Sequence, residues 1–246
     1  LYAIGVGASA EELPFVYEGS PGGMKVLPSF CVAPAVRAFP YVGEDVEWSR
    51  MLHGEQTIRL SRPLPPEGRI VQVGELTNIY DKGKGAVYHI QVTGRTEEGD
   101  HLYDANWAIF YLGAGGFGGD PGPKVASLDP PEGVEPDLTI SSKVAENQAL
   151  LYRLSGDYNP LHLDPEAARR GGFDRPILHG LCTYGFAVRG IVNGVLDGDV
   201  GRFRSFKARF SASVYPGDTL TTQCWVEKGR CLVRVSTDRG VVLRNG

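Results

Sequence analysis

Hydrophobic and polar positions alternate in two series of predicted strands that follow the same order along the chain. Period-two alternation is typical of strands with one buried face, and clusters of Pro, Gly and Asp mark the turns between them. In the first series, turns at 65–68 and 81–85 separate strand-like runs at 56–64, up to Tyr80, and at 87–94. In the second series, turns at 215–218 and 228–230 separate runs at 206–214, 219–227 and 231–236. The repeated order predicts a duplicated antiparallel sheet.

A boundary between the two halves follows the strand-like run at 101–112. Residues 113–123 are too rich in Gly and Pro for regular structure, and a polar, Pro-containing stretch continues to about Asp137. We therefore divide the chain into a first half at 1–120, a linker at 121–137 and a second half at 138–246. By comparison with the first half, we expect the chain to end within or before the last strand of the second.

Two helices are predicted in the second half. Ser141 or Ser142 can cap the first helix, which Gly156 ends. The second helix follows Gly180 and is apolar over most of its surface, so it should be buried. A buried helix wrapped by a curved antiparallel sheet is the hot-dog arrangement. The predicted fold class is α+β, a double hot dog with two antiparallel sheets, each wrapped round a central helix.

Composition and charge exclude several classes of function. Hydrophobic residues make up 42% and charged residues 22% of the 246 positions, as in ordinary globular proteins. The net charge of −4 gives no basic footprint, so we expect no nucleic-acid partner. No apolar run is long enough to span a bilayer. Four scattered cysteines without a C-x-x-C pair predict free thiols in a reducing compartment and no metal site. Since the sequence begins at Leu1 rather than Met, we expect the natural N-terminus to lie upstream.

The string from Gly156 to His162 carries the candidate chemistry. Between two predicted helices, Asp157, Asn159 and His162 supply a carboxylate, an amide and an imidazole on a short loop fixed by Pro160. Such a loop can direct Asp157 and His162 at one water for general acid–base catalysis, with Asn159 orienting either partner or the water. The alternative is that Asp157 and Asn159 only form Asx turns and that His162 only precedes a helix.

Gly180, in the segment 173–180, is a candidate oxyanion donor. The amide of a glycine at a helix N-terminus is unpaired, lies at the positive end of the helix dipole and has no side chain to block a ligand. It suits a thioester carbonyl that gains negative charge. Tight packing between helix and sheet explains the same glycine equally well, and the two explanations are compatible.

Four other features of the sequence could have a functional role, judged from residue type alone. The glycine string at 113–119 lacks the Lys-Ser/Thr ending of a phosphate loop and leads into a linker, so we interpret it as a connection. His89 and His101 fall in alternating runs and are interpreted as ordinary sheet residues. His53 and Gly54 open the first strand series beside apolar residues and are kept as candidates.

Together these strings resemble the MaoC-like (R)-specific enoyl-CoA hydratases, and most of all the type 2 hydratase domain of peroxisomal multifunctional enzymes. The resemblance rests chiefly on Gly156–His162 and on the run 173–186. It extends into the first half through the strings 1–8, 52–56 and 81–85. It therefore covers nearly the whole chain, and the string G-D-x-N-P-L-H is highly specific.

The resemblance implies hydration of a trans-2-enoyl-CoA to a (3R)-3-hydroxyacyl-CoA, and the reverse dehydration. Asp157 and His162 would act on the water, Asn159 would support them, and the Gly180 amide would bind the thioester oxygen. Further positions are implied to contact the acyl-CoA: His53, Gly54, Lys82, Tyr158, Pro160, Leu161 and Phe210. The first half has no G-D-x-N-P-x-x-H string, which implies one active site per chain.

The implied partner is an acyl-CoA thioester, and neither a metal nor a cofactor other than this CoA is expected. A homodimer is expected, located in the peroxisome for a eukaryotic multifunctional enzyme and in the cytoplasm for a bacterial protein. Three alternatives stay open: a 3-hydroxyacyl-carrier-protein dehydratase, a hot-dog acyl-CoA thioesterase, and a non-catalytic acyl-CoA-binding module.

Overall fold

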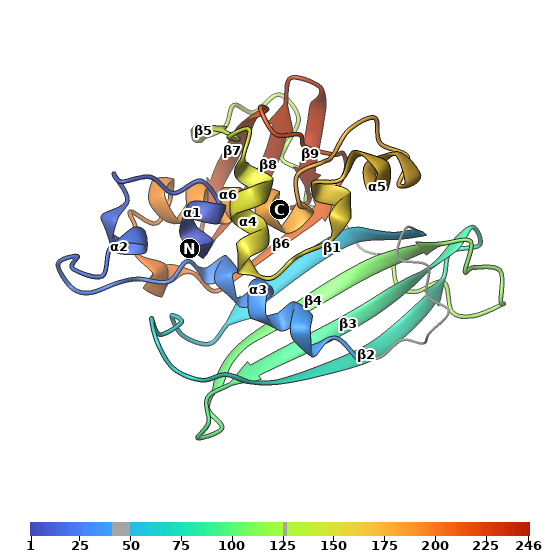
Figure 1. Ribbon diagram of the computed structural model, residues 1–246, viewed down its shortest axis with the longest axis horizontal. Helices are drawn as coiled ribbons and strands as arrows, with labels where there is room; N and C mark the ends of the chain where they lie inside the picture. The colour runs from blue at the N-terminus through green and yellow to red at the C-terminus, as the bar shows by residue number, and fades with distance from the viewer. Residues whose placement is uncertain (41–49, 125–126) are drawn as a thin grey trace.

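The computed structural model describes residues 1–40, 50–124 and 127–246, and their strands form one continuous antiparallel sheet (Figure 1). The nine strands lie in the order β2-β3-β4-β1-β6-β9-β8-β7-β5. The first half contributes β1 (Met51–Leu60), β2 (Val71–Asp81), β3 (Gly85–Arg95) and β4 (His101–Leu112). The second half contributes β5 (Leu138–Lys143), β6 (Ser205–Phe210), β7 (Thr219–Glu227), β8 (Arg230–Thr237) and β9 (Gly240–Arg244).

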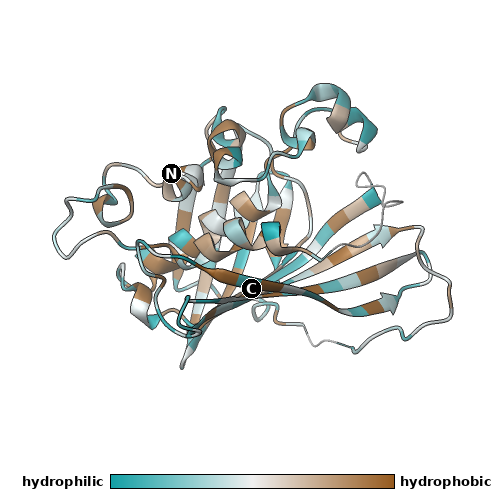
Figure 2. Cartoon of the chain, turned by 60° about the horizontal axis from the view of Figure 1, so that its bottom comes forward, coloured by the Kyte–Doolittle hydropathy of each residue, from teal (hydrophilic) through white to brown (hydrophobic). Residues whose placement is uncertain are grey.

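The repeated strand order predicted from the sequence is confirmed. In the first half, β4 lies between β1 and β3, and in the second, β9 lies between β6 and β8. The halves meet where β1 pairs antiparallel with β6, from Glu55 opposite Arg209 to Arg59 opposite Ser205. This pairing joins the two predicted sheets into one. Figure 2 shows hydrophobic and hydrophilic segments alternating along these strands, as the period-two pattern requires.

Helix α6 (Gly180–Gly194) is the central helix of the second half, as predicted. Most of its side chains are buried, and its apolar surface packs into the main hydrophobic core. The hydroxyl of Tyr184 donates a hydrogen bond of 2.7 Å to the carbonyl of Phe206, which ties the helix to β6. At Gly185, a Cβ atom would lie 2.4 Å from Cγ1 of Val6, so only glycine lets the N-terminal segment approach this closely.

The N-terminal segment consists of short helices that cover α6 rather than forming a second long helix. Gln148 donates a 2.7 Å hydrogen bond to the Gly5 carbonyl, and the Cys182 thiol donates another to the same atom. The residues at 32–35 form α3, which packs over β3 in Figure 1. In the described part of the first half, a series of short turns thus takes the place of a single long helix. The short elements are α1 (Tyr2–Gly5), α2 (Leu13–Val16), η1 (Pro28–Cys31), α3 (Val32–Ala35) and η2 (Val36–Ala38).

The prediction that Ser141 or Ser142 caps a helix is wrong. Both residues lie in β5, which pairs with β7 and alternates between half-buried and exposed positions. Helix α4 (Gln148–Tyr152) begins only after Asn147, and the 3-10 helix η4 (Arg153–Ser155) extends it. Gly156, with φ of 119°, ends the helical segment as predicted. Neither serine can cap this helix, because a cap needs a helix to begin directly after it.

The stretch at 121–137 contains no helix or strand in its described residues, and residues 125–126 lie outside them. Its end is fixed to the sheet, since Trp225 Nε1 donates a 2.8 Å hydrogen bond to the Val134 carbonyl. The predicted loop at 113–119 is also irregular, and Gly116 and Gly118 donate amide hydrogen bonds to the Asp81 carboxylate. Among the described residues, no helix is long and apolar enough to cross a membrane.

Candidate active site

The candidate catalytic loop is a series of side-chain-capped turns between η4 and helix α5 (Pro165–Arg170). The amide of Asn159 donates 3.2 Å to Oδ1 of Asp157, and the amide of Leu161 donates 3.0 Å to Oδ1 of Asn159. Asn159 thereby caps the 3-10 helix η5 (Pro160–His162), and Asp164 caps α5 as predicted. The Asx turns considered from the sequence are therefore present. They fix the backbone that positions His162.

The structure brings Asp157 and His162 together. His162 is 8% exposed, and its Nδ1 lies 2.9 Å from the carbonyl oxygen of Ile177. A carbonyl can only accept, so Nδ1 carries the proton and Nε2 of the neutral ring holds the free lone pair. One carboxylate oxygen of Asp157 and one ring nitrogen of His162 lie within 4.8 Å of each other. This is a spacing that one water molecule can bridge.

Electrostatics favour a neutral His162. Burial lowers the pKa of its imidazole, and the nearby Asp157 carboxylate and the Ile177 carbonyl only partly oppose this effect. Desolvation disfavours the charged form of a histidine, so the ring remains an available base at neutral pH. A neutral imidazole beside a carboxylate is the protonation state that general base catalysis requires.

Gly180 is the first residue of α6 and directly follows His179, whose ring stacks on that of His162. Within the described residues, no acceptor is hydrogen-bonded to its amide, as expected at a helix N-terminus. A Cβ atom at this position would lie 3.1 Å from Cε1 of Phe210, so the glycine also permits close packing. Both explanations considered for Gly180 are therefore compatible with the geometry.

Phe210 connects the catalytic half to His53 and Gly54 of the first half. The rings of His53 and Phe210 lie 4.6 Å apart between centroids. Gly54 occupies a β-bulge where the register of β1 against β4 shifts. A Cβ there would lie 3.1 Å from the Ala108 carbonyl, and such bulges commonly redirect neighbouring side chains. His53 and Phe210 thus form a continuous wall toward Gly180.

The other predicted substrate contacts are less closely grouped. Tyr158 is 56% exposed beneath the guanidinium of Arg153, Pro160 is exposed, and Leu161 is half-buried beside Gly171. Lys82 contacts the Pro121 carbonyl and the ring of Tyr80. None of the described contacts of Lys82 reaches Asp157 or His162.

The side chain of Asn159 is exposed, and its Oδ1 accepts a hydrogen bond from the Leu161 amide, so the catalytic role of Asn159 stays a prediction. It supports Asp157 through its backbone amide.

Sequence reasoning missed His179 as part of this site. The ring of His179 stacks on the ring of His162 with centroids 3.7 Å apart and an interplanar angle of 29°. Its Nε2 lies 3.2 Å from the carbonyl oxygen of Asp157. The only sequence signal was its position directly before Gly180, and nothing in the spacing paired it with His162.

Asp157, His162 and His179 are close enough to raise the question of a metal ion. Imidazole lone pairs lie in the plane of the ring, and stacked, nearly parallel rings direct them along nearly parallel planes. Tetrahedral ligands must instead converge on one point. Nδ1 of His162 is also held by the Ile177 carbonyl. The arrangement therefore suits ring packing and does not suit a shared ion.

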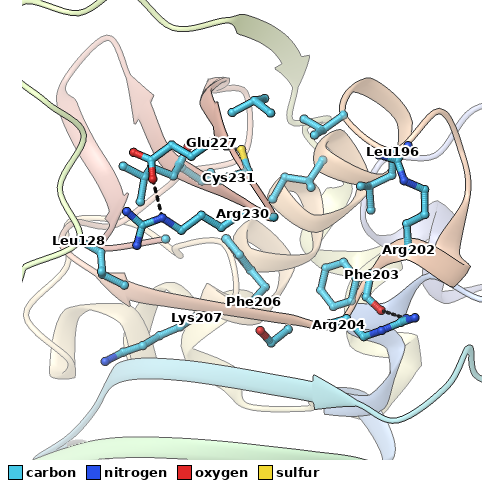
Figure 3. A pocket seen from close by; sticks show the side chains of 18 residues that line it. Leu128, Leu196, Arg202, Phe203, Arg204, Phe206, Lys207, Glu227, Arg230 and Cys231 are labelled. Carbon is cyan, nitrogen blue, oxygen red and sulfur yellow. Dashed lines mark hydrogen bonds and ion pairs between the residues drawn. The ribbon is translucent and has the colours of Figure 1, made fainter.

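A sizeable cavity lies elsewhere, between β6 and β8 (Figure 3). Its volume is about 590 Å³, and its lining includes Phe203, Phe206 and Cys231. In the first half, the twelve-residue β4 fills the space between β1 and β3. In the second half, the matching strand β9 has only five residues, and the cavity lies in the space between β6 and β8. Neither Asp157 nor His162 lines this cavity. A small hollow of about 10 Å³ adjoins Asp157.

Two family models match the chain along its length. One, described as a MaoC like domain, matches residues 128–242, and another, described as the MFE-2 hydratase 2 N-terminal domain, matches residues 1–113. The chain is 41% identical over 233 residues to a probable enoyl-CoA hydratase 2 of Dictyostelium discoideum, across 92% of the chain and 79% of the relative. The chain belongs to the MaoC-like hydratase family.

Solved structures agree with this membership. The MaoC-like chain superposes with a TM-score of 0.87 and 35% identity on full-length peroxisomal multifunctional enzyme type 2 from Drosophila melanogaster, covering 99% of the chain and 44% of that enzyme. A Mycobacterium tuberculosis protein described as a double hotdog fold superposes with a TM-score of 0.61 at 14% identity, over 98% of the chain and 88% of that protein. The second likeness concerns the fold alone, and the predicted double hot dog is confirmed.

Proposed function

We propose that this protein hydrates trans-2-enoyl-CoA thioesters to (3R)-3-hydroxyacyl-CoA and catalyses the reverse dehydration. The observation that carries the proposal is the pairing of the Asp157 carboxylate with a buried His162 whose Nε2 is free, beside the unpaired Gly180 amide. The hydratase activity named for the Dictyostelium relative supports the same reaction.

In the proposed mechanism, one water is held between Asp157 and Nε2 of His162. Its oxygen forms a bond to C3 as His162 or Asp157 accepts its proton, and the C2–C3 π electrons move toward the thioester carbonyl. The Gly180 amide hydrogen-bonds the oxygen that gains negative charge. Transfer of a proton to C2 then restores the carbonyl and completes the addition of one water.

The stereochemical outcome follows from having both groups on one loop. Because Asp157 and His162 approach the substrate from the same side, the hydroxyl and the proton are added to one face of the double bond. The proposal is therefore syn addition. The (3R) configuration is proposed from the resemblance to the (R)-specific hydratases, because syn addition alone does not decide which face of the double bond meets the pair. Addition of water changes no overall oxidation state, so no redox cofactor is part of the proposal. No metal is part of it either, because the proposed mechanism assigns activation of the water to Asp157 and His162.

A panel of trans-2-enoyl-CoA substrates tests the proposal. Hydration is followed by loss of absorbance of the conjugated thioester, and product chirality is determined by chromatography on a chiral phase. We expect the (3R) product for at least one chain length. A (3S) product contradicts the proposed (3R) specificity.

The three alternative functions predict different results in the same panel. Release of free thiol identifies a thioesterase, and a strong preference for carrier-protein substrates identifies a carrier-protein dehydratase. Binding of acyl-CoA without turnover identifies a binding module. The juxtaposition of Asp157 with the free Nε2 of His162 argues against the binding module, since binding alone needs no base.

We also propose that His53, Gly54 and Phe210 form one wall of the acyl-CoA site and that Lys82, Tyr158, Pro160 and Leu161 contact the substrate at its periphery. The contact of His53 with Phe210, and of Phe210 with Gly180, supports the first part. The exposure of Tyr158 and Lys82 is compatible with the second. Lys82 is the least supported of these, because its described contacts lie away from Asp157.

A homodimer is part of the proposal. Strand β2 is an edge of the sheet, and Val71, Val73, Leu76 and Ile79 on it are exposed. Long apolar edge strands are commonly covered by a partner. Sedimentation equilibrium should give twice the chain mass of 26.6 kDa.

For location, we propose the peroxisome if the chain is part of a eukaryotic multifunctional enzyme and the cytoplasm if it is bacterial.

A further inference from the structure

His179 contacts both members of the proposed catalytic pair. One ring face stacks on His162 with centroids 3.7 Å apart. Its Nε2 is 3.2 Å from the backbone carbonyl of Asp157. Its own backbone leads directly into Gly180, for which it is the residue before the first helical turn. The side chain is only 1% exposed.

The hydrogen bond fixes the tautomer of this ring. The Asp157 carbonyl can only accept, so Nε2 of His179 carries the proton and donates. Nδ1 is then a bare lone pair, and it is buried without a hydrogen-bond partner. Burial lowers the pKa of His179 to about 2, and the neighbouring His162 adds to this effect. His179 therefore stays neutral when His162 accepts a proton.

The surroundings of His179 leave little room for another role. Tyr152 packs on it with ring centroids 4.9 Å apart. Of the titratable groups that face the ring, Tyr152, Arg153 and Asp157 come from α4 and the segment after it, and His162 comes from η5. The ring is thus enclosed between the helical segment before the catalytic loop and the catalytic histidine itself.

We propose that His179 is a positioning residue that sets the distance between Asp157 and His162 by stacking on one and hydrogen-bonding the other. The inference rests on the proposed function and identifies a further residue that the reaction needs. Acid–base catalysis depends on sub-ångström placement of both partners, and a displacement of about 1 Å can cost about 100-fold in rate. No other common side chain of this size offers both a flat ring and an N–H donor at its far end.

Two substitutions separate the two contacts. His179→Phe keeps the stacked ring and removes the donor, whereas His179→Gln keeps an N–H at nearly the same reach and removes the ring. We expect each to lower kcat by about 10- to 100-fold while KM changes by less than about threefold, because the binding surfaces stay in place.

Tyr184→Phe is the matched control, since it removes another buried hydrogen bond to a backbone carbonyl on the same helix, away from the site. It should lower thermal stability and leave kcat within about twofold of the wild type.

A second readout needs no substrate. In His179→Ala, water reaches the His162 ring, so the pKa of His162 measured by NMR should rise toward its ordinary value of about 6.5. In His179→Phe, the burial is kept and the pKa of His162 should stay low. Should the alanine variant fail to fold, the pKa of His162 is compared between the phenylalanine and glutamine variants instead. It should be higher in the glutamine variant, which lacks the covering ring.

The results separate this inference from the proposed function. If the wild type does not hydrate enoyl-CoA, the function fails, and the NMR measurement still decides whether His179 positions His162. If the wild type is active but folded His179→Phe and His179→Gln retain its kcat, or change only KM, the positioning role is wrong.

Discussion

The two halves share one arrangement of strands and differ in what lies against it. In each half a four-strand series has its last member between the first and third, β4 in one and β9 in the other. Only the second half carries a 15-residue buried helix and the loop that ends in His162. The described helices of the first half before β1 are three or four residues long. The sheet thus provides a frame, and the chemistry depends on one loop and one helix N-terminus.

The first half reaches the candidate catalytic pair where the two halves meet. The pairing of β1 with β6 brings the start of β1 beside Phe210, and His53 packs on that ring. A half without a carboxylate–imidazole pair can therefore still shape the binding surface. In this mechanism the second half makes and breaks bonds, whereas the first half contacts the substrate. Substitutions in each half test this assignment.

The largest expected effects concern Asp157 and His162. Asp157→Asn and His162→Ala should each lower kcat by at least about 100-fold, since each removes a positioned acid or base. KM should change little, because neither residue is proposed to hold much of the CoA. Steady-state hydration of an enoyl-CoA measures both constants.

A histidine of the first half supplies the control for these variants. His101 lies at the start of β4, where it hydrogen-bonds Ser61 and pairs with Asp104, and neither of these partners belongs to the catalytic loop. His101→Ala should keep kcat within about twofold of the wild type. A loss as large as that of His162→Ala would show that the first half takes part in bond-making.

The stoichiometry of ligand binding tests the same division. Because the first half lacks the acid–base loop, titration with a tight, non-hydrolysable acyl-CoA analogue should saturate at one equivalent per chain. Isothermal titration calorimetry measures this directly. Two equivalents would reveal a second functional pocket in the first half.

Much of this frame was predictable, because it depends on local patterns. Alternation and Pro-Gly turns predicted the strands from β1 to β4 and from β6 to β8, and apolar spacing predicted α6. The cap at Ser141 was misplaced because β5 is too short for its alternation to stand out beside two serines. The stack of His179 on His162 joins residues 17 positions apart through the packing of α6, and no sequence spacing encodes it.

Buried histidines predict an acid-dependent loss of stability in both halves. Burial lowers the pKa of His179 to about 2 and that of His53 to about 4, whereas an unfolded histidine titrates near about 6.5. Between these pH values the two histidines bind protons in the unfolded chain but not in the folded chain. The free energy of unfolding therefore falls as the pH drops below about 6.5, at up to about 1.4 kcal/mol per pH unit for the buried His179.

Urea unfolding from pH 7 to pH 4 measures this dependence. His179→Phe should flatten it most, and His53→Gln should flatten it less, because the His53 side chain is only half-buried and water screens its charge. If neither substitution changes the slope, the acid sensitivity arises from other groups, and the neutral state of these two rings does not affect stability.

The smallest expected effect belongs to Lys82 at the turn between β2 and β3. If its charge meets a CoA phosphate, Lys82→Ala should raise KM by a few-fold and leave kcat nearly unchanged, because only uniform binding is lost. The effect should shrink in high salt, as for any exposed charge. Lys84→Ala, in the same turn, is the matched control. An unchanged KM at low ionic strength would remove Lys82 from the site and leave the Asp157–His162 pair untouched.

The central claim is that Asp157 and His162 act on one shared water, and a double-mutant cycle tests it most directly. The kcat of Asp157→Asn, of His162→Ala and of the double variant are compared with that of the wild type under identical conditions. The effects of substituting groups that act as a unit are strongly non-additive. The kcat of the double variant should therefore be little lower than that of the less active single variant. A loss equal to the product of the two single losses would mean that the residues act independently, and it would contradict the shared-water mechanism.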